Sequence, residues 1–525
     1  MDSILLRRLG LFAIVAAIIM MPTFLFGPGD SHSVAYNYIW TSQFGTEMAH
    51  GNFYPRWLPG SFEGLGSPTF YFYPPLAYWI AGAFDAIGFS TFAAINITAF
   101  LVLTLSGLAM YQWLAERGTW PRLGAILYMA APYHLMDFYV RGALAEFTAF
   151  IWLPLIALAI ARIPQRRGIW LLGLSYGGLI LTHLPVAMLT GLFLIAPLAL
   201  HRVAKDRTTL LPLLIGGALA IGLASFYLIP ALTMQGDISS ALLWEAFYRP
   251  SSWSLLAPNS LLKILPIPAL AAGLVVLALP SRSIWTAIAV LVGVSALGLI
   301  PYMWDIAPLN RAQFPWRLLG ILEFASITAL LSRKTGPIVL GLGCGLIFFV
   351  YYMWILESAD YLVKPVDYAM LARELPDAPE YLPAGFDTRL VREIDRKADL
   401  RAWRRIPPGK EINVKHSGDV MMRHAAFPIW RVTRDGVEVP HKGPIIHFHA
   451  EPGRYRIERI LVWQEIVGMI LTALSVILLL WVAFGAQRGR ISLLSKFPAY
   501  SPFSAISGWP GFLWLGRLKR SGGAQ

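Results

Sequence analysis

The stretch LVWQEIVGMILTALSVILLLWVAF, at residues 461–484, decides the class of fold to which this chain belongs. It contains one charged side chain, Glu465, among its 24 residues. A helix crosses the hydrocarbon layer of a bilayer with about 20 mostly apolar residues, so this stretch predicts a membrane-spanning helix. We therefore expect residues 459–484 to form the final span of a membrane protein.

Apolar runs of similar length recur through the rest of the chain. Of the 525 residues, 56% are hydrophobic and only 14% are charged, whereas soluble domains carry roughly 25% charged residues. The composition predicts a polytopic α-helical membrane protein with about twelve transmembrane helices. The expected spans, to within a few residues, are 9–26, 92–114, 122–137, 145–161, 169–184, 186–200, 209–230, 262–280, 284–301, 315–331, 336–356 and 461–484.

Basic residues are concentrated in the short segments between these runs. A net charge of +13 can indicate a nucleic-acid-binding face, but basic clusters between spans are typical of cytoplasmic loops under the positive-inside rule. The pattern therefore predicts a bilayer partner and no nucleic acid, with both termini in the cytoplasm. The clusters expected on that side are Arg7-Arg8, 117–122, 162–167, 201–207, Arg282, Arg333-Lys334 and a basic tail at 485–525.

The same layout divides the chain into domains. Residues 1–357 are expected to form a transmembrane domain whose first outer loop covers residues 28–91. Residues 358–458 are rich in charge and proline and contain no long apolar run, which predicts a small β-rich extracytoplasmic domain before the last span. Its predicted strands are 412–415, 427–432, 437–439, 445–449 and 455–457, with Asp435-Gly436 as a turn signal.

The ionisable residues beside the predicted spans are concentrated on the outer side. Such groups are costly at membrane depth and are usually functional. Because they come from different spans but share one side of the membrane, we expect them to converge on a shared polar cavity. They are Asp30, His32, Arg56, Arg141, Glu146, His183 and Arg317.

Several of these residues also have a purely structural interpretation. Asp30 precedes a helix-like stretch at residues 33–49 and is explained equally well as its N-cap. Arg141 and Glu146 are five residues apart and are compatible with an ordinary ion pair, and His183 is compatible with a helix-end histidine.

Two other polar features of the sequence lie outside this group. Glu323 is the one carboxylate well inside a predicted span, where we expect it to pair with a neighbouring helix or to stay protonated. His447 and His449 alternate on a predicted strand, but two ligands are too few for a metal site. No metal ligands are therefore predicted.

Eight short motifs follow one another along the chain. They are GDSH (29–32), GNFYPRW (51–57), GSPTFYFYPPL (66–76), APY (131–133), RGALAE (141–146), FPWRL (314–318), EYLP (380–383) and FPIWRV (427–432). In order and spacing they resemble bacterial membrane proteins described as 6-pyruvoyl-tetrahydropterin synthase-related. Those proteins are similar in turn to the YfhO-like proteins and to the GT-C glycosyltransferase superfamily. The resemblance covers nearly the whole chain except the tail.

This resemblance implies a GT-C-like fold and an inverting glycosyltransferase of the bacterial inner membrane. Such an enzyme takes a sugar from a polyprenyl-phosphate carrier and transfers it to a glycan, lipid or protein acceptor on the extracytoplasmic side. Asp30 stands where these enzymes carry an acidic residue in the first outer loop, which implies that it is the catalytic base. The implied residues for the donor phosphate are Arg56, Arg141 and Arg317, and the implied supporting residues are His32, Glu146 and His183.

Two features of the sequence bear on this chemistry. The phosphate-binding loop GxxxxGK[ST] does not occur, as expected of an enzyme that uses a lipid-linked donor. Ser31 and His32 stand where many GT-C enzymes have a second acidic residue, which argues against a divalent metal cofactor. The alternative functions are a transporter or flippase of lipid-linked glycan, which favours ionisable groups near the bilayer midplane and broken helices, and a non-catalytic membrane scaffold.

Overall fold

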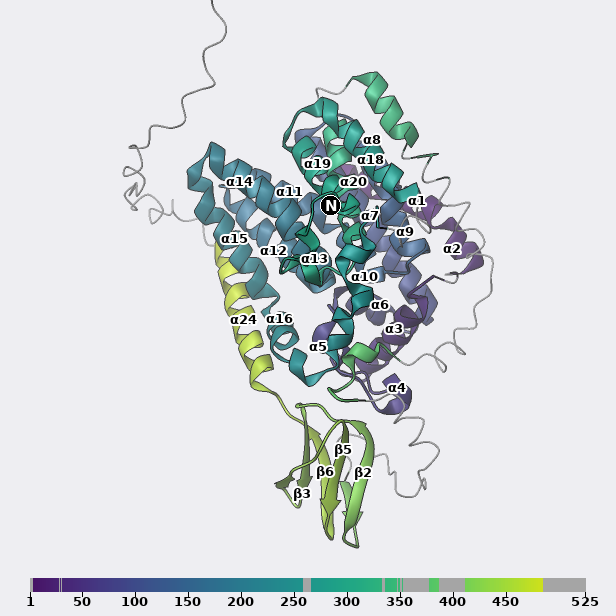
Figure 1. Cartoon of the computed structure of the whole chain (residues 1–525), viewed down its shortest axis with the longest axis vertical. Coiled ribbons are helices and arrows are strands. Elements are labelled where there is room, and N and C mark those ends of the chain that lie inside the picture. The colour runs from purple at the N-terminus through teal and green to yellow at the C-terminus, as the bar shows by residue number, and fades with distance from the viewer. Residues whose placement is uncertain are drawn as a thin grey trace, which may run out of the picture.

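The computed structural model describes residues 3–27, 29, 31–257, 266–332, 336–346, 348–349, 352, 377–386 and 411–484. It shows a helical body with a small β module at one end of the long axis (Figure 1). Asp30, the predicted basic tail and most of the predicted outer domain before residue 411 lie outside the described residues.

The helical body is built from many short and a few long helices. Its first part comprises α1 (Ser3–Ile19), α2 (Met21–Phe26), α3 (Val34–Ala49), α4 (Ser61–Gly64), α5 (Thr69–Phe72), α6 (Leu76–Ala86), α7 (Thr91–Arg117), α8 (Pro121–Met129), α9 (Pro132–Tyr139), α10 (Leu144–Ala149) and α11 (Trp152–Arg162). Its second part comprises α12 (Arg166–Thr182), α13 (Leu184–Thr190), a π-helical turn (Gly191–Ile195), α14 (Ala196–Lys205), α15 (Leu210–Leu223), α16 (Ser225–Thr233), α18 (Pro266–Ala278), α19 (Ile284–Leu297), α20 (Leu318–Leu330) and α24 (Trp463–Phe484).

Four helical stretches of the described residues are long and apolar enough to cross a membrane. They are Thr91–Arg117, Leu144–Arg162, Leu184–Lys205 and Trp463–Phe484. A fifth candidate, Arg207–Leu223 with Ser225–Thr233, is bent by 71°, and the apolar helices Ile267–Ser281, Ile284–Leu297 and Pro337–Leu346 are shorter. The helical body with several apolar helices is therefore confirmed, whereas the count of about twelve spans stays a prediction.

The bend between α15 and α16 is stabilised by hydrogen bonds from a neighbouring helix, α24. A break in a membrane helix frees backbone groups that must find partners inside the protein. Here the N–H of Phe226 donates to Oγ1 of Thr472 at 3.0 Å, and that hydroxyl donates to the carbonyl of Gly222 at 3.1 Å. A Cβ on Gly468 would lie 2.6 Å from the carbonyl oxygen of Ser225, so glycine is needed for the close approach of the two helices.

The segment predicted to be the first outer loop, residues 28–91, contains α3 to α6. Ser33 occupies the position before α3, and its side chain makes no capping hydrogen bond. The chain turns just before the helix, where the N–H of Val34 donates to the carbonyl of Ser31 at 3.2 Å. Asp30 lies outside the described residues, so the interpretation of Asp30 as a cap of this helix stays a prediction.

The β module consists of two small antiparallel sheets. The strands are β1 (Glu411–Val414), β2 (Gly418–Ala425), β3 (Trp430–Arg434), β4 (Val437–Val439), β5 (Ile445–Ala450) and β6 (Gly453–Arg459). One sheet has the order β1-β6-β3-β4, and β2 pairs with β5 in the other. Asp435 and Gly436 have φ angles of 49° and 85°, as a two-residue hairpin turn requires. The sequence predicted five of these strands approximately and missed β2.

The β module docks against the first outer loop. The N–H of Ala425 donates to the carbonyl of Leu65 at 2.8 Å. The ring of His424 stacks on Trp57 with 5.1 Å between centroids, and Phe427 lies 5.4 Å from the ring of Tyr71. These contacts join two segments that are far apart in the sequence, and they fix the module at the end of the body seen in Figure 1.

Candidate active site

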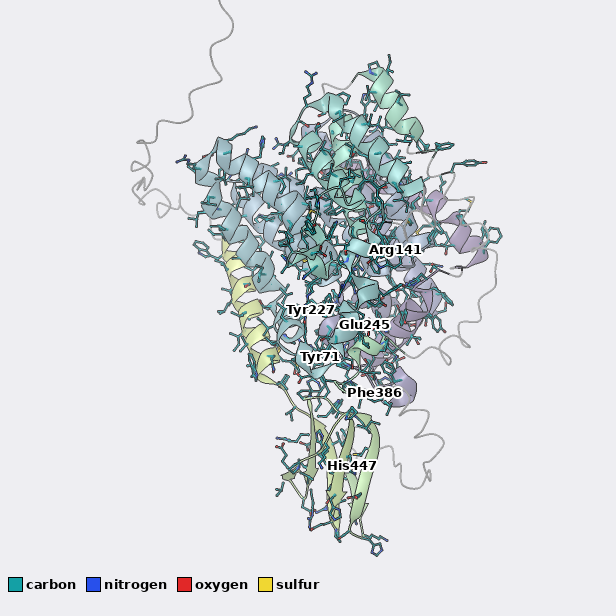
Figure 2. All side chains as sticks on the ribbon, in the orientation of Figure 1. Tyr71, Arg141, Tyr227, Glu245, Phe386 and His447 are labelled. Atoms are coloured by element: carbon teal, nitrogen blue, oxygen red, sulfur yellow. The ribbon has the colours of Figure 1, made fainter. Side chains whose placement is uncertain are left out.

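The carboxylate of Glu146, in the first turn of α10, is the centre of a buried charged cluster. Arg141 Nη1 lies 2.7 Å and Arg317 Nε lies 3.3 Å from Glu146 Oε2. The hydroxyl of Tyr133 donates to Oε1 at 2.6 Å, and His183 Nε2 lies 4.0 Å from Oε2. Four separate elements thus meet at one carboxylate, and Figure 2 shows Arg141 within the helical body. Four residues of the predicted set, Arg141, Glu146, His183 and Arg317, are brought together here.

A tight turn between α9 and α10 places Arg141 beside Glu146. Gly142 has a φ of +61°, and a Cβ at this position would lie 2.4 Å from the hydroxyl oxygen of Ser31. Both the left-handed backbone and the lack of space require glycine at this position. The chain therefore reverses at residue 142, so that the side chains of residues 141 and 146 meet.

The residues that follow Asp30 are hydrogen-bonded to the backbone of the turn between α9 and α10. The backbone N–H of His32 donates to the carbonyl of Val140 at 3.1 Å, and that of Ser33 donates to the carbonyl of Arg141 at 2.9 Å. The His32 side chain is exposed, with its Nδ1 3.3 Å from the Ser33 hydroxyl. The start of the first outer loop is thus attached to the arginine turn, although Asp30 itself lies outside the described residues.

Arg317 is held in place at the start of α20. Its Nη1 donates to the carbonyl of Ala312 at 2.9 Å and to Oε1 of Gln313 at 3.3 Å. Its guanidinium carbon lies 5.0 Å from the centroid of the Phe314 ring. These contacts orient the guanidinium plane so that Nε points to Glu146.

Asp137 is a member of the cluster that sequence reasoning missed. Its Oδ1 pairs with Nη1 of Arg141, one helical turn away, and its side chain is fully buried. Among the described residues, its Oδ2 has no hydrogen-bond partner. Two carboxylates therefore face two guanidinium groups, which compensates the buried charges. The i,i+4 spacing of Asp137 and Arg141 was the available signal in the sequence.

Glu323 supports the cluster from the neighbouring helix. Its Oε1 accepts a hydrogen bond from the N–H of Tyr133 at 2.7 Å, and its Oε2 accepts one from the N–H of His134 at 3.3 Å. The first N–H groups of a helix have no partners within that helix, and α9 begins at Pro132 after a break in the predicted span. Glu323 therefore caps α9 from α20, in agreement with the expectation that it pairs with a neighbouring helix.

His183 is a helix-end histidine, as one of the two interpretations of the sequence predicts, and it also lies beside Glu146. It is the N-cap residue of α13, where Nδ1 accepts a hydrogen bond from the N–H of Val186 at 3.2 Å. Because Nδ1 is the acceptor, a neutral ring carries its proton on Nε2, which faces Glu146. The helix break thus positions a ring N–H beside the central carboxylate.

Aromatic rings border the charged cluster. Burial raises the pKa of Tyr73 to about 12, and the charges of Arg317, Glu146 and Arg141 also act on its phenol. The Tyr73 ring lies 4.7 Å from that of Trp40, and the rings of Phe314 and Trp316 stack at 4.6 Å. The ring of Phe314 thus lies against Arg317, and its stack with Trp316 extends the aromatic surface on that side of the cluster.

Arg56 lies in a second cluster, away from the position that the sequence led us to expect. Its Nη1 pairs with Oε1 of Glu465 at 3.3 Å, and its Nη2 donates to the carbonyl of Phe226 at 2.9 Å. Glu465 Oε1 also accepts hydrogen bonds from Arg459 at 2.6 Å and from the hydroxyl of Tyr71 at 2.9 Å. Within the described residues, no contact joins Arg56 to Glu146. The structure therefore connects Arg56 to the start of α24.

We expect Glu465→Gln to weaken the attachment of α24 and the β module to the first outer loop. The change leaves Arg56 buried without a carboxylate, whereas Arg459, the other partner of Glu465, can still reach water. We therefore expect the free energy of unfolding to fall by about 2 kcal/mol. Hydrogen exchange of β6 and thermal unfolding in nanodiscs would measure this loss. Glu458→Gln is the matched control, because Glu458 pairs with half-exposed arginines. Equal stability of the two variants would contradict the expectation.

A metal site among the described residues would need three or more suitable side chains close together. Within them, no group of three or more His, Cys, Asp or Glu side chains is arranged to hold a metal ion. His449 pairs with Asp419 through Nδ1 at 2.9 Å on the exposed surface of the β module.

Comparison with known proteins places the chain among membrane proteins. The family described as "6-pyruvoyl-tetrahydropterin synthase related domain; membrane protein" matches residues 70–248. A cryo-EM structure of arabinofuranosyltransferase AftD from Mycobacteria is similar to 67% of this chain, with 17% identity and a TM-score of 0.43. A mutant form of AftD matches the same share, with 15% identity and a TM-score of 0.43. The match covers only 27% and 28% of the two AftD chains. Curated proteins contain no match.

Proposed function

We propose that this membrane protein, whose residues 70–248 match the family described as 6-pyruvoyl-tetrahydropterin synthase related domain, is a glycosyltransferase. It transfers a sugar from a polyprenyl-phosphate-linked donor to a glycan, lipid or protein acceptor on the extracytoplasmic side. The observation that carries the proposal is the convergence of Arg141 and Arg317 on Glu146 inside the helical body. The motif resemblance adds the reaction class.

The arginines are suited to a phosphate leaving group. A guanidinium group has five N–H donors in a planar fork that matches the oxygens of a phosphate. In the contacts among described residues, Arg141 donates only through Nη1. Its Nε and Nη2 edge therefore remains available to an incoming phosphate, while Glu146 and Asp137 keep the side chain in place. In this arrangement the negative charge that develops on the departing lipid phosphate is stabilised without a metal ion.

Asp30 remains the proposed general base. Inverting transfer requires a carboxylate that takes the proton of the acceptor hydroxyl as the bond to the sugar forms. The support from the structure is indirect, because Ser33 and His32 attach the start of the first outer loop to the backbone beside Arg141. A base on this segment would act next to the phosphate-binding arginines. The donor sugar would then lie between Asp30 and Arg141.

A transporter of lipid-linked glycan is the second candidate. Helices broken within the membrane are typical of transporters, and the α15–α16 pair is bent by 71°. His183 also interrupts the run from α12 to α13, next to a buried carboxylate. Transport and transfer differ in their products, since only transfer creates a new glycosidic bond.

We expect Arg317→Lys to lower sugar transfer by about tenfold or more, because lysine keeps the charge but loses the planar fork. Purified protein in proteoliposomes would be supplied with a panel of polyprenyl-phosphate sugars carrying a radioactive label, and the glycosylated product would be quantified. Arg311→Lys is the matched control, since Arg311 lies nearby but contacts the ring of Trp244. Movement of labelled lipid between leaflets without a glycosylated product would favour the transporter instead.

A further inference from the structure

A side chain of the first outer loop completes the attachment of the turn between α9 and α10. The carbonyls of Val140 and Arg141 accept hydrogen bonds from the backbone N–H groups of residues 32 and 33. The carbonyl of Gly142, the next residue of the turn, accepts one from Nδ2 of Asn37, on α3. Of these three bonds, that of Asn37 alone depends on the identity of a side chain, so a substitution can remove it and leave the other two.

The amide of Asn37 is buried and has a partner at each end. Asn37 is 6% exposed, and its Oδ1 accepts a hydrogen bond from the hydroxyl of Tyr78, on α6, at 2.7 Å. Its Nδ2 donates to Gly142. A reversed amide would place Oδ1 against the carbonyl of Gly142, where two acceptors would face each other. The two partners therefore fix the direction in which the amide donates.

Tyr78 is itself fixed by the packing of its ring. It is buried, and its ring centroid lies 5.2 Å from that of Phe70 and 5.5 Å from that of Trp40. The helix that carries it, α6, packs against both α3 and α10, and Figure 1 shows these three helices next to one another. A close-packed ring has little freedom to move, so Tyr78 is a fixed partner for Asn37.

The start of α3 and the turn leave no space between them. A Cβ on Gly142 would lie 3.1 Å from the backbone nitrogen of Val34 and even closer to the side chain of Ser31. The carbonyl of Gly142 also accepts a hydrogen bond from the N–H of Leu144 at 3.1 Å. One carbonyl thus joins the bonding inside the turn to the bond from α3. A shift of α3 would therefore move the turn with it.

The backbone of the turn decides where the edge of Arg141 points. In the contacts among described residues, its guanidinium donates only through Nη1, to Tyr133, Asp137 and Glu146. Contacts that converge on one nitrogen hold that atom in place but do not fix the plane of the group as a two-point contact does. The position of the backbone then sets the direction of the Nε and Nη2 edge. Asn37 acts on this edge through the backbone.

We propose that Asn37, oriented by Tyr78, is a positioning residue that sets the edge of Arg141 for the phosphate of the lipid-linked donor. This inference rests on the proposed glycosyltransferase function and deepens it, because it makes the first outer loop a part of the donor-phosphate site. A displacement of about 1 Å in a positioning group can have an effect of about 10²-fold. We expect a smaller effect here, because two backbone bonds still hold the turn when Asn37 is replaced.

The test measures the binding of farnesyl phosphate to the full chain in nanodiscs. Phosphorus NMR reports the bound ligand, and empty nanodiscs give the reference for partition into lipid. Asn37→Leu nearly keeps the shape of the side chain but removes both its donor and its acceptor. We expect this change to raise the Kd for farnesyl phosphate by about tenfold. Tyr78→Phe, which removes the partner of Oδ1, should raise the Kd by about threefold, and it is the test variant if Asn37→Leu does not fold.

The Kd separates a positioning role from a merely structural one. A variant that folds less well contains fewer competent molecules, but each of them binds with the Kd of the wild type. Asn37→Asp adds a second distinction, because its protonated carboxyl can donate to Gly142 and accept from Tyr78. At acidic pH its Kd should therefore lie within about threefold of that of the wild type at the same pH, whereas Asn37→Leu should still bind weakly.

Thr46→Ala is the matched control on the same helix. Thr46 is exposed, and its hydroxyl donates to the carbonyl of Ser42 within α3 at 2.8 Å, so its replacement should leave the Kd unchanged. Hydrogen exchange tests the attachment independently of any ligand. The N–H of Ser33, which donates to the carbonyl of Arg141, should exchange faster in Asn37→Leu than in the wild type or in Thr46→Ala.

The outcomes distinguish the positioning role from the proposed reaction. A wild-type Kd in Asn37→Leu, or unchanged exchange at Ser33, would overturn the positioning role alone. Absence of farnesyl phosphate binding by the wild type would overturn both the phosphate site and its positioning by Asn37. Binding that depends on Asn37, without sugar transfer from any polyprenyl-phosphate donor, would support the positioning role and count against the glycosyltransferase.

Discussion

Replacing Glu146 by glutamine is expected to destabilise the protein by about 3–5 kcal/mol, the usual effect of removing one partner from a buried ion pair. The carboxylate is 2% exposed and compensates Arg141 and Arg317, whose side chains are 17% and 8% exposed. Without it, both guanidinium groups stay buried and only Asp137 remains to balance them. Thermal or denaturant unfolding of the variant in nanodiscs measures this effect.

The same substitution should lower sugar transfer by at least about 10²-fold, because a displacement of about 1 Å in positioning groups can have that effect. Glu116→Gln is the control, since Glu116 pairs with Arg162 where both side chains are partly exposed. Such a pair contributes at most about 1 kcal/mol. If Glu146→Gln were as stable and as active as Glu116→Gln, the cluster would have neither of the roles assigned to it.

Replacing Asp30 by asparagine is expected to lower transfer by about 10²–10⁴-fold, the usual contribution of a general base. Asparagine has nearly the same shape as aspartate but does not take up a proton at neutral pH. Asparagine caps a helix about as well as aspartate, so a change in helix capping does not complicate the result. Expression and thermal unfolding of the variant should match those of the wild type.

The control for this experiment is Asp305→Asn, which removes an exposed carboxylate in another connection between helices. Transfer would be measured under single-turnover conditions with saturating donor, so that a change in donor binding does not hide a change in chemistry. Normal transfer by purified Asp30→Asn protein would exclude Asp30 as the base and would leave the arginine cluster as the only support for the reaction class.

Local patterns in the sequence were sufficient for much of the fold. The last helix, α24 (Trp463–Phe484), begins within four residues of the predicted start and ends where predicted. The long helix α7 (Thr91–Arg117) covers the predicted span at 92–114. These predictions succeed because a long apolar segment in a bilayer must satisfy its backbone within itself, and a helix does so.

Where long-range pairing decides the structure, local patterns were insufficient. β2 (Gly418–Ala425) has no clear alternation of apolar and polar residues, and it is a strand because it pairs with β5. The predicted span at 122–137 is divided into α8 and α9, because the chain breaks before Pro132 and the exposed helix end is capped by Glu323. In both cases the partner lies in a distant segment of the chain.

The sequence by itself determined that this is a helical membrane protein and that Arg141, Glu146, His183 and Arg317 are unusual in their apolar surroundings. Only the tertiary structure decided which of them meet. Glu146 and Arg317 are 171 residues apart, whereas Arg56 pairs with Glu465 of the last helix. The physical reason is that a charge in an apolar environment requires compensation, which a sequence reveals. The identity of its partner depends on how the helices are rotated and where the chain turns, and these follow only from the packing of the whole molecule.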